Sequence, residues 1–297
     1  MRHFLILFLV VTHTCFCNSQ TINQKAIDED GSEKLLGIIN KEGLTKTPYN
    51  EWFSKNYDDY LVNDKVVKKL KDSLKQYEIT VFLGTWCGDS KREVPRFYNI
   101  LKTAKFPENQ LKVVAVDRTE EAYKQSPTNE EKGLNIHRVP TFIFYKNGNE
   151  VNRIVESPLE TLENDILKIV TDNKYTPNYM AANYLNYLLN TKTIDSLQTE
   201  EPILVPRLAE FVKGSRELNT YGYSLLRSNQ IEKALYVFNL NTKIFPYKHT
   251  VFDSLGEANF VAKNYTEALK CYYKVLSLKP DEKNAIEMIE KIKLENK

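Results

Sequence analysis

The chain has 297 residues, of which 42% are hydrophobic and 27% charged, and its formal net charge is +2. This length allows two domains with separate cores, and the composition is that of an ordinary soluble globular protein. The near-neutral charge, without any block of lysine and arginine, excludes the basic surface that nucleic-acid binding requires.

Residues 1–19 have the features of a secretory signal peptide. Arg2 and His3 precede an apolar run over residues 4–11, and small and polar residues then predominate through Ser19. Because the run is too short to span a bilayer as a helix, we expect cleavage near residue 19 and no stable membrane span in the mature chain. The expected destination is a bacterial periplasm or cell envelope, or secretion. A buried N-terminal strand is the alternative interpretation.

The cysteine pattern argues against a disulfide-stapled scaffold. Cleavage would remove Cys15 and Cys17, either of which could instead be lipidated, although the residues before them fit a lipoprotein site poorly. The mature chain would keep only Cys87 and Cys271. The histidines are scattered, and neither a C-x-x-C pair nor a glycine-rich phosphate loop is present. We therefore expect no metal and no cofactor.

Residues 20–60 form a polar lead segment with several aromatic side chains, to which no element is assigned. The first clear element follows it. Asp64 can cap a helix in which Val66, Val67, Leu70 and Leu74 fall on one face.

Four β-rich runs come next, over residues 79–83, 111–116, 141–145 and 151–155. Asn147-Gly148 joins the last two runs, which predicts a hairpin.

Two further helices are predicted around these runs. Val94, Phe97 and Ile100 recur at helical spacing after the first run. After the hairpin, residues 157–160 supply an N-cap serine, a proline at the first helical position and a capping-box glutamate.

Two patches in this order resemble the thioredoxin active site. Trp86-Cys87-Gly88-Asp89-Ser90 directly follows the first strand, and Val139-Pro140-Thr141 opens the third about fifty residues later. Pro95 occupies the place of the proline that kinks the active-site helix in thioredoxins. The resemblance covers residues 61–172 and implies an α/β thioredoxin-like fold for that domain.

Cys87 is the expected nucleophile. A cysteine at a helix N-terminus faces unpaired N–H groups and the positive end of the helix dipole, both of which favour the thiolate. Ser90 stands where thioredoxins have their second cysteine, so the chain lacks a resolving thiol. Its hydroxyl is placed to donate a hydrogen bond to the sulfur. Val81 stands where many thioredoxins have a buried aspartate that assists proton transfer.

The resemblance also implies roles for neighbouring residues. It makes Pro140 the cis-proline, Val139 its substrate-facing partner and Trp86 a lid on the site. Arg138 is placed to reach the sulfur or the substrate. His137 is interpreted as a surface residue rather than a proton relay.

The sequence after residue 177 is helical and repeats with a period of 34. Gly222 and Gly256 are one matched pair, and the others are Ala234 and Ala268, Phe238 and Tyr272, and Pro246 and Pro280. This period resembles the tetratricopeptide repeat, which implies an all-α repeat domain over 177–297 with clear units at 215–248 and 249–282. Such a domain either binds a protein partner or serves only as a scaffold.

Two functions are consistent with this sequence. The first is thiol–disulfide exchange through Cys87, as isomerisation, removal of thiol caps or mixed-disulfide capture, with cysteine-containing proteins or small thiols as partners. The chain would then be an oxidoreductase or isomerase. The second is a redox-silent module that binds peptides or proteins.

Overall fold

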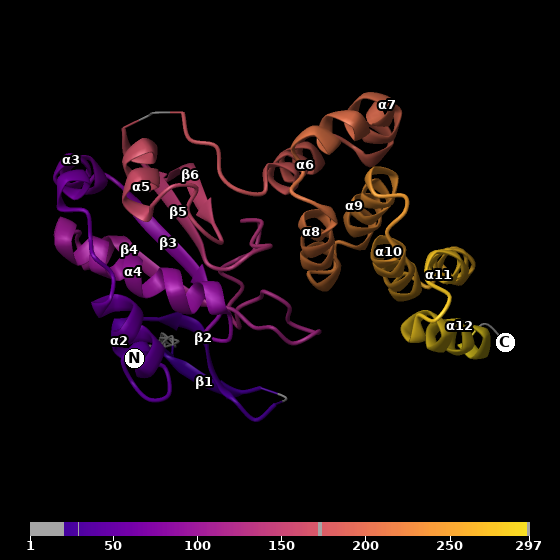
Figure 1. Ribbon diagram of the computed structural model, residues 1–297, viewed down its shortest axis with the longest axis horizontal. Coiled ribbons are helices and arrows are strands. Elements are labelled where there is room, and N and C mark those ends of the chain that lie inside the picture. The colour runs from indigo at the N-terminus through magenta and orange to yellow at the C-terminus, as the bar shows by residue number, and fades with distance from the viewer. Residues whose placement is uncertain (1–20, 29, 172–173, 296–297) are drawn as a thin grey trace, which may run out of the picture.

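The computed structural model describes residues 21–28, 30–171 and 174–295, so the predicted signal peptide lies outside the described residues. A region with one sheet and flanking helices comes first and an all-helical region follows (Figure 1). This arrangement confirms the predicted fold class. No helix in the described ranges combines the length and the apolar character needed to cross a bilayer.

The sheet has six strands in the order β1-β2-β4-β3-β5-β6 (Figure 1). Their bounds are Gln24–Ile27, Glu33–Ile39, Glu78–Leu83, Leu111–Ala115, Thr141–Lys146 and Asn149–Val155 for β1 to β6. The pair β3 and β4 is parallel, and the other neighbours are antiparallel. All four predicted strands are confirmed, as is the hairpin through Asn147-Gly148.

The helices of this region cover one face of the sheet. They are α1 (Lys41–Leu44), α2 (Asn50–Asp58), α3 (Asp64–Leu74), α4 (Gly88–Ala104) and α5 (Leu162–Val170), with a 3-10 turn at Glu108–Gln110. Alternation along β3 divides its side chains between two clusters. Val81 joins the core under the helices, and Phe82 packs on the opposite face with Ile136 and Val139. That second face carries the residues around Cys87.

The segment 20–60 is part of this folded region. It supplies β1 and β2, and β2 pairs with the central strand β4. Tyr49 and Phe53 are buried in the core beneath the helices. The sequence left this segment unassigned because its apolar residues are sparse and show no long period.

Two predicted helix starts are wrong in detail. The cap of α3 is Asn63, whose side chain accepts from the N–H of Val66, and Asp64 is the first helical residue. The cap of α5 is Thr161 instead of Ser157. The buried carboxylate of Asp165 accepts from the backbone N–H groups of residues 159 and 160, which keeps that segment outside the helix.

The C-terminal region consists of seven consecutive helices within the described residues. They are α6 (Met180–Thr191), α7 (Ile194–Phe211), α8 (Ser215–Arg227), α9 (Ile231–Ile244), α10 (His249–Val261), α11 (Tyr265–Leu278) and α12 (Lys283–Glu295). Gly222 lies against the ring of Phe238, and Gly256 against that of Tyr272. These close approaches explain why the matched positions pair a glycine with an aromatic residue.

The two regions contact each other through the loop between β4 and β5. Gln125 donates to the carbonyl of Arg227 at 2.7 Å, and Asn135 donates to the side chain of Asn183 at 3.3 Å. Arg227 also pairs with Glu120 at 2.7 Å. Helix α8 therefore lies against the loop that leads to Val139 (Figure 1).

Candidate functional site

Cys87 lies where β3 leads into α4 and is the N-cap residue of that helix. A tight turn positions it, because its N–H donates to the carbonyl of Gly84 at 2.9 Å. The thiol is partly exposed, and its Sγ donates to the carbonyl oxygen of Val139 at 3.3 Å. The fold thus brings together two predicted site residues that are 52 positions apart.

Val139 and Pro140 are held by hydrogen bonds on both sides. The peptide bond between them is cis. The carbonyl of Pro140 accepts from the N–H of Glu156 at 2.7 Å, and the Thr141 hydroxyl donates to the carbonyl of Arg138 at 2.7 Å. These hydrogen bonds therefore hold the backbone of this segment in place opposite the sulfur.

Ser90 has a different partner from the one predicted. It is fully buried, and its Oγ accepts from the N–H of Gly84 at 3.2 Å. Among the described hydrogen bonds, none joins Ser90 to Cys87. Through this hydrogen bond the serine connects the first turn of α4 to the end of β3.

Trp86 lies beside Cys87 and packs with it against the apolar cluster of Val116 and Val139. Its indole Nε1 donates to the carbonyl of Val116 at 3.0 Å. A Cβ at Gly84 would lie 2.5 Å from the ring, so only glycine fits there. Trp86 is consequently fixed in place at the edge of the site.

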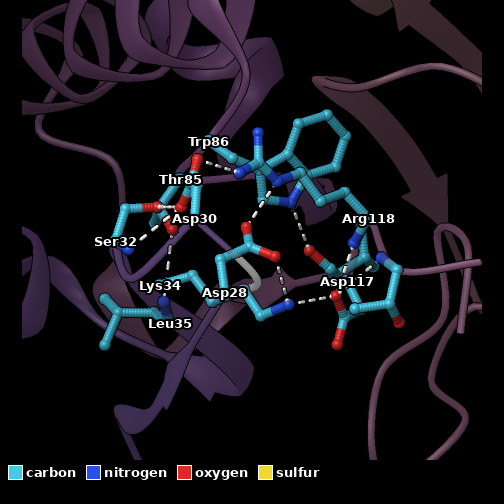
Figure 2. Close-up of polar contacts among 11 residues, drawn as sticks. Asp28, Asp30, Ser32, Lys34, Leu35, Thr85, Trp86, Asp117 and Arg118 are labelled. Carbon is cyan, nitrogen blue, oxygen red and sulfur yellow. Dashed lines mark hydrogen bonds and ion pairs between the residues drawn. The ribbon is translucent and has the colours of Figure 1, made fainter.

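A network of charged side chains lies next to Trp86 (Figure 2). Lys34 is buried between Asp28, at 3.3 Å, and Asp117, and Arg118 pairs with Asp28 and with Asp30. Burial alone would lower the pKa of Lys34, but the hydrogen bonds and charges of Asp117 and Asp28 outweigh it and raise the pKa.

The ion pair with Lys34 opposes the effect of burial on the pKa of Asp117. Burial raises its pKa, but hydrogen bonds from Lys34 and two backbone N–H groups leave the pKa below its usual value. The N–H of Leu35 also donates to the hydroxyl of Thr85 at 3.2 Å. Strand β2 is thus bound directly to the loop that carries Trp86 and Cys87 (Figure 2).

Arg138, which was predicted to reach the sulfur or the substrate, contacts the helical region. Its guanidinium pairs with Glu156 at 3.0 Å and lies 4.7 Å from the ring centre of Tyr179. It also donates to the carbonyl of Arg216, in α8, at 3.3 Å. The prediction that this side chain reaches the sulfur is therefore replaced by a contact between the two regions.

His137 is not a surface residue, which corrects its interpretation from sequence. It is 1% exposed, because the rings of Tyr179 and Tyr221 from the helical region cover it. Burial, together with the nearby charges of Lys124, Arg138 and Arg153, lowers its pKa to about 3. The ring is neutral at pH 7 and serves as packing.

Tyr123 and Lys124 were missed from sequence. Lys124 is 6% exposed and its Nζ donates to the hydroxyl of Tyr123. Burial and the charge of Arg138 lower the pKa of Lys124 to about 7, while the charges of Cys87 and Glu156 oppose that effect. The pKa of Tyr123 is raised by burial and by the charge of Cys87. This loop has no periodicity that could have indicated either residue.

Cys271 differs from Cys87 in its surroundings. It is 8% exposed in α11, and burial raises its pKa to about 11. It is a packed thiol. Both cysteines of the described residues are free thiols, and Cys87 is the more exposed of the two.

Two comparisons with known proteins concern the sheet-containing region. Residues 41–167 match the family described as Thioredoxin. A thioredoxin H-type protein of Oryza sativa subsp. indica is 30% identical over 115 residues, which is 39% of this chain and 83% of that protein. The family match ends before α6, so it does not extend to the helical region.

Proposed function

The chain belongs to the thioredoxin family, and we propose that its thioredoxin-like domain carries out thiol–disulfide exchange with Cys87 as the nucleophile. The observation that carries this proposal is the geometry of the thiol. Cys87 caps α4, is partly exposed, and lies 3.3 Å from the carbonyl of Val139. A thiol at a helix N-terminus, next to a backbone segment held in place, is well positioned to attack the disulfide of an extended polypeptide.

The proposed reaction begins with loss of the Cys87 proton to solvent. The thiolate attacks one sulfur of a substrate disulfide, forming a new S–S bond while the other sulfur leaves as a thiolate and takes up a proton. Ser90 cannot attack this mixed disulfide. A second thiol, from the substrate itself or from a small thiol, attacks the substrate's sulfur and releases Cys87. The number of disulfide bonds is the same before and after, so the reaction is isomerisation or exchange.

Lys124 supports the first step of this reaction. Its ammonium group is buried in the loop beside the site, and the charge of Cys87 acts on it. A cation near the sulfur favours the thiolate over the thiol. Trp86, Val139 and Pro140 supply the fixed surroundings.

The proposal also includes export of the protein and a tetratricopeptide-type helical domain that binds a protein partner. Residues 1–19 act as a signal peptide that directs the chain to a periplasm or cell envelope, and N-terminal sequencing of the mature protein would contradict this if it returned Met1. The period of 34 supports a tetratricopeptide-type domain, with the approach of Gly222 to Phe238 repeated at Gly256 and Tyr272.

Alkylation of the native protein with iodoacetamide across pH tests the exchange role. We expect Cys87 to react faster than a free thiol at pH 7, and the Cys87→Ser variant to lose this fast phase, because Cys271 is buried. The wild type should also form long-lived mixed disulfides with cysteine-containing proteins. Slow alkylation together with no trapped adduct would favour the redox-silent binding module.

The Ser90→Cys variant tests the missing resolving thiol. A cysteine one helical turn from Cys87 should attack the mixed disulfide and shorten its lifetime. Ser90→Ala is the matched control, because it removes the hydroxyl without adding a thiol. Equal adduct lifetimes in all three proteins would show that position 90 does not face the sulfur.

A further inference from the structure

A cleft of about 400 Å³ lies between the β4–β5 loop and the helical region. Tyr123, Lys124 and Ile136 line it from the loop, and Asn190 from α6 and Tyr221 from α8 line it from the helices. Its volume is within the range of ligand sites in proteins. Neither region forms this cleft alone.

The lining of the cleft is rich in carboxamides. Seven of its residues are asparagine or glutamine, from both walls. A carboxamide both donates and accepts hydrogen bonds, which matches the alternating N–H and C=O groups of an extended polypeptide. Asn135 also has a buried Oδ1 without a hydrogen-bond partner in the described residues.

The charged residues of the cleft are largely paired with each other or with the protein. Arg227 pairs with Glu120 and Glu257, and Glu131 accepts from the backbone and hydroxyl of Ser126. Arg227 is therefore already neutralised by carboxylates, and the carboxamides outnumber the charged residues of the lining. The chemistry favours a neutral, amide-bearing ligand.

The cleft shares two residues with the surroundings of the sulfur. Ile136 lines it and packs in the same cluster as Val139, Trp86 and Cys87. Lys124 lines it as well, and the charge of Cys87 acts on that side chain. The cleft and the sulfur are thus linked through the apolar cluster on the same face of the sheet.

We propose that the cleft binds an extended segment of the substrate polypeptide while Cys87 attacks its disulfide. The inference rests on the proposed exchange function and assigns part of substrate recognition to the helical region. Selectivity for protein disulfides over small disulfides follows, because a small disulfide cannot reach both the sulfur and α6.

The test separates binding from chemistry by using the full-length Cys87→Ser protein. The probe is reduced, carboxymethylated lactalbumin, a permanently unfolded chain without reactive thiols, and its affinity is measured by calorimetry. Asn190→Trp and Lys132→Trp fill the cleft from opposite walls, and both positions are exposed. We expect each to weaken binding about tenfold.

Tyr187→Trp is the matched control, because Tyr187 is exposed on the same helix as Asn190 and does not line the cleft. It should bind like the parent protein. Absence of measurable binding by the parent, or equal affinities for Asn190→Trp and Tyr187→Trp, would overturn the cleft proposal. With Cys87 present, the rate with a small aromatic disulfide reports separately on exchange, and the cleft variants should leave it unchanged.

Discussion

Two side chains, Cys87 and Lys124, determine the charge at the centre of the site. Burial and Arg138 hold the pKa of Lys124 near 7, so this lysine changes charge within the range where a thiol also titrates. Tyr123, Arg138 and Glu156 are the other titratable or charged neighbours that act on it. Thiol reactivity should therefore depend on the protonation of Lys124.

Replacing Lys124 by methionine removes the cation and keeps an apolar chain of similar length. Below pH 7 Lys124 carries its positive charge, and loss of that charge beside the sulfur should make the variant alkylate at Cys87 about threefold more slowly at pH 6. At pH 9 the lysine is largely neutral and the two rates should converge. Iodoacetamide kinetics across this range provide the measurement.

Lys132→Met is the control for that variant, because Lys132 is an exposed lysine of the same loop. It should alkylate at the wild-type rate. If Lys124→Met were unchanged at pH 6, or if Lys132→Met had the same effect, a specific action of Lys124 on the sulfur would be refuted.

Local spacing allowed part of the site to be predicted. Cys87 follows one strand that the sequence clearly indicates and Val139 precedes another, and the turn after β3 places the thiol at a helix start. The partners of Ser90, His137 and Arg138 depend on tertiary contacts that no local pattern encodes. Lys124 is the extreme case, because its burial arises from a long polar loop packed between two regions.

At the level of elements, the helical region depends on close approach of paired helices. A Cβ at Gly222 would lie 2.6 Å from the ring of Phe238, whereas a Cβ at Gly256 would lie 3.0 Å from that of Tyr272. The two positions are equivalent in the repeat, but Gly256 leaves more space than Gly222 for a Cβ atom beside the aromatic ring. They should therefore respond differently to the same substitution.

Gly222→Ala should lower the free energy of unfolding by about 1–3 kcal/mol, because the ring of Phe238 must move. The gain of about 1 kcal/mol in helix propensity offsets only part of this loss. Gly256→Ala should cost less, since a shift of a few tenths of an ångström relieves the contact. Urea unfolding followed by circular dichroism measures both.

The Gly222→Ala/Phe238→Leu double variant identifies the mechanism. A smaller side chain opposite the new methyl group should make the alanine less costly than it is beside phenylalanine. If alanine cost the same in both backgrounds, contact with the ring would not be the cause.

Elements were predicted best where one residue pattern decides the outcome. β3 alternates between two buried faces, and the hairpin turn has its own sequence signal. The start of α5 was misplaced because the carboxylate of Asp165, within the helix, binds the amides of residues 159 and 160. The segment 20–60 joins the sheet through long-range pairing with β4, which its own sequence does not indicate.

For the whole molecule, His137 makes the junction of the two regions sensitive to acid. It is buried neutral under Tyr179 and Tyr221, with its pKa lowered to about 3. The unfolded chain binds a proton near pH 6.5, whereas the folded chain does so only near pH 3. Stability from this residue is complete above pH 6.5 and decreases as the pH falls toward 3.

Between pH 6.5 and 5 the wild type should lose about 2 kcal/mol through His137, at about 1.4 kcal/mol per pH unit. The His137→Phe variant cannot titrate there, so its stability should change less over the same interval. Urea unfolding at the two pH values measures this, and identical slopes for His137→Phe and wild type would contradict it.

The hydrogen bond from Cys87 to Val139 makes the thiol and the substrate compete for one acceptor. In the free protein the Sγ–H donates to the carbonyl oxygen of Val139 at 3.3 Å. A polypeptide that offers its own N–H to this carbonyl replaces the thiol as the donor. Docking of an extended chain therefore releases the sulfur from the hydrogen bond that holds it, at the step in which the sulfur must turn towards the disulfide.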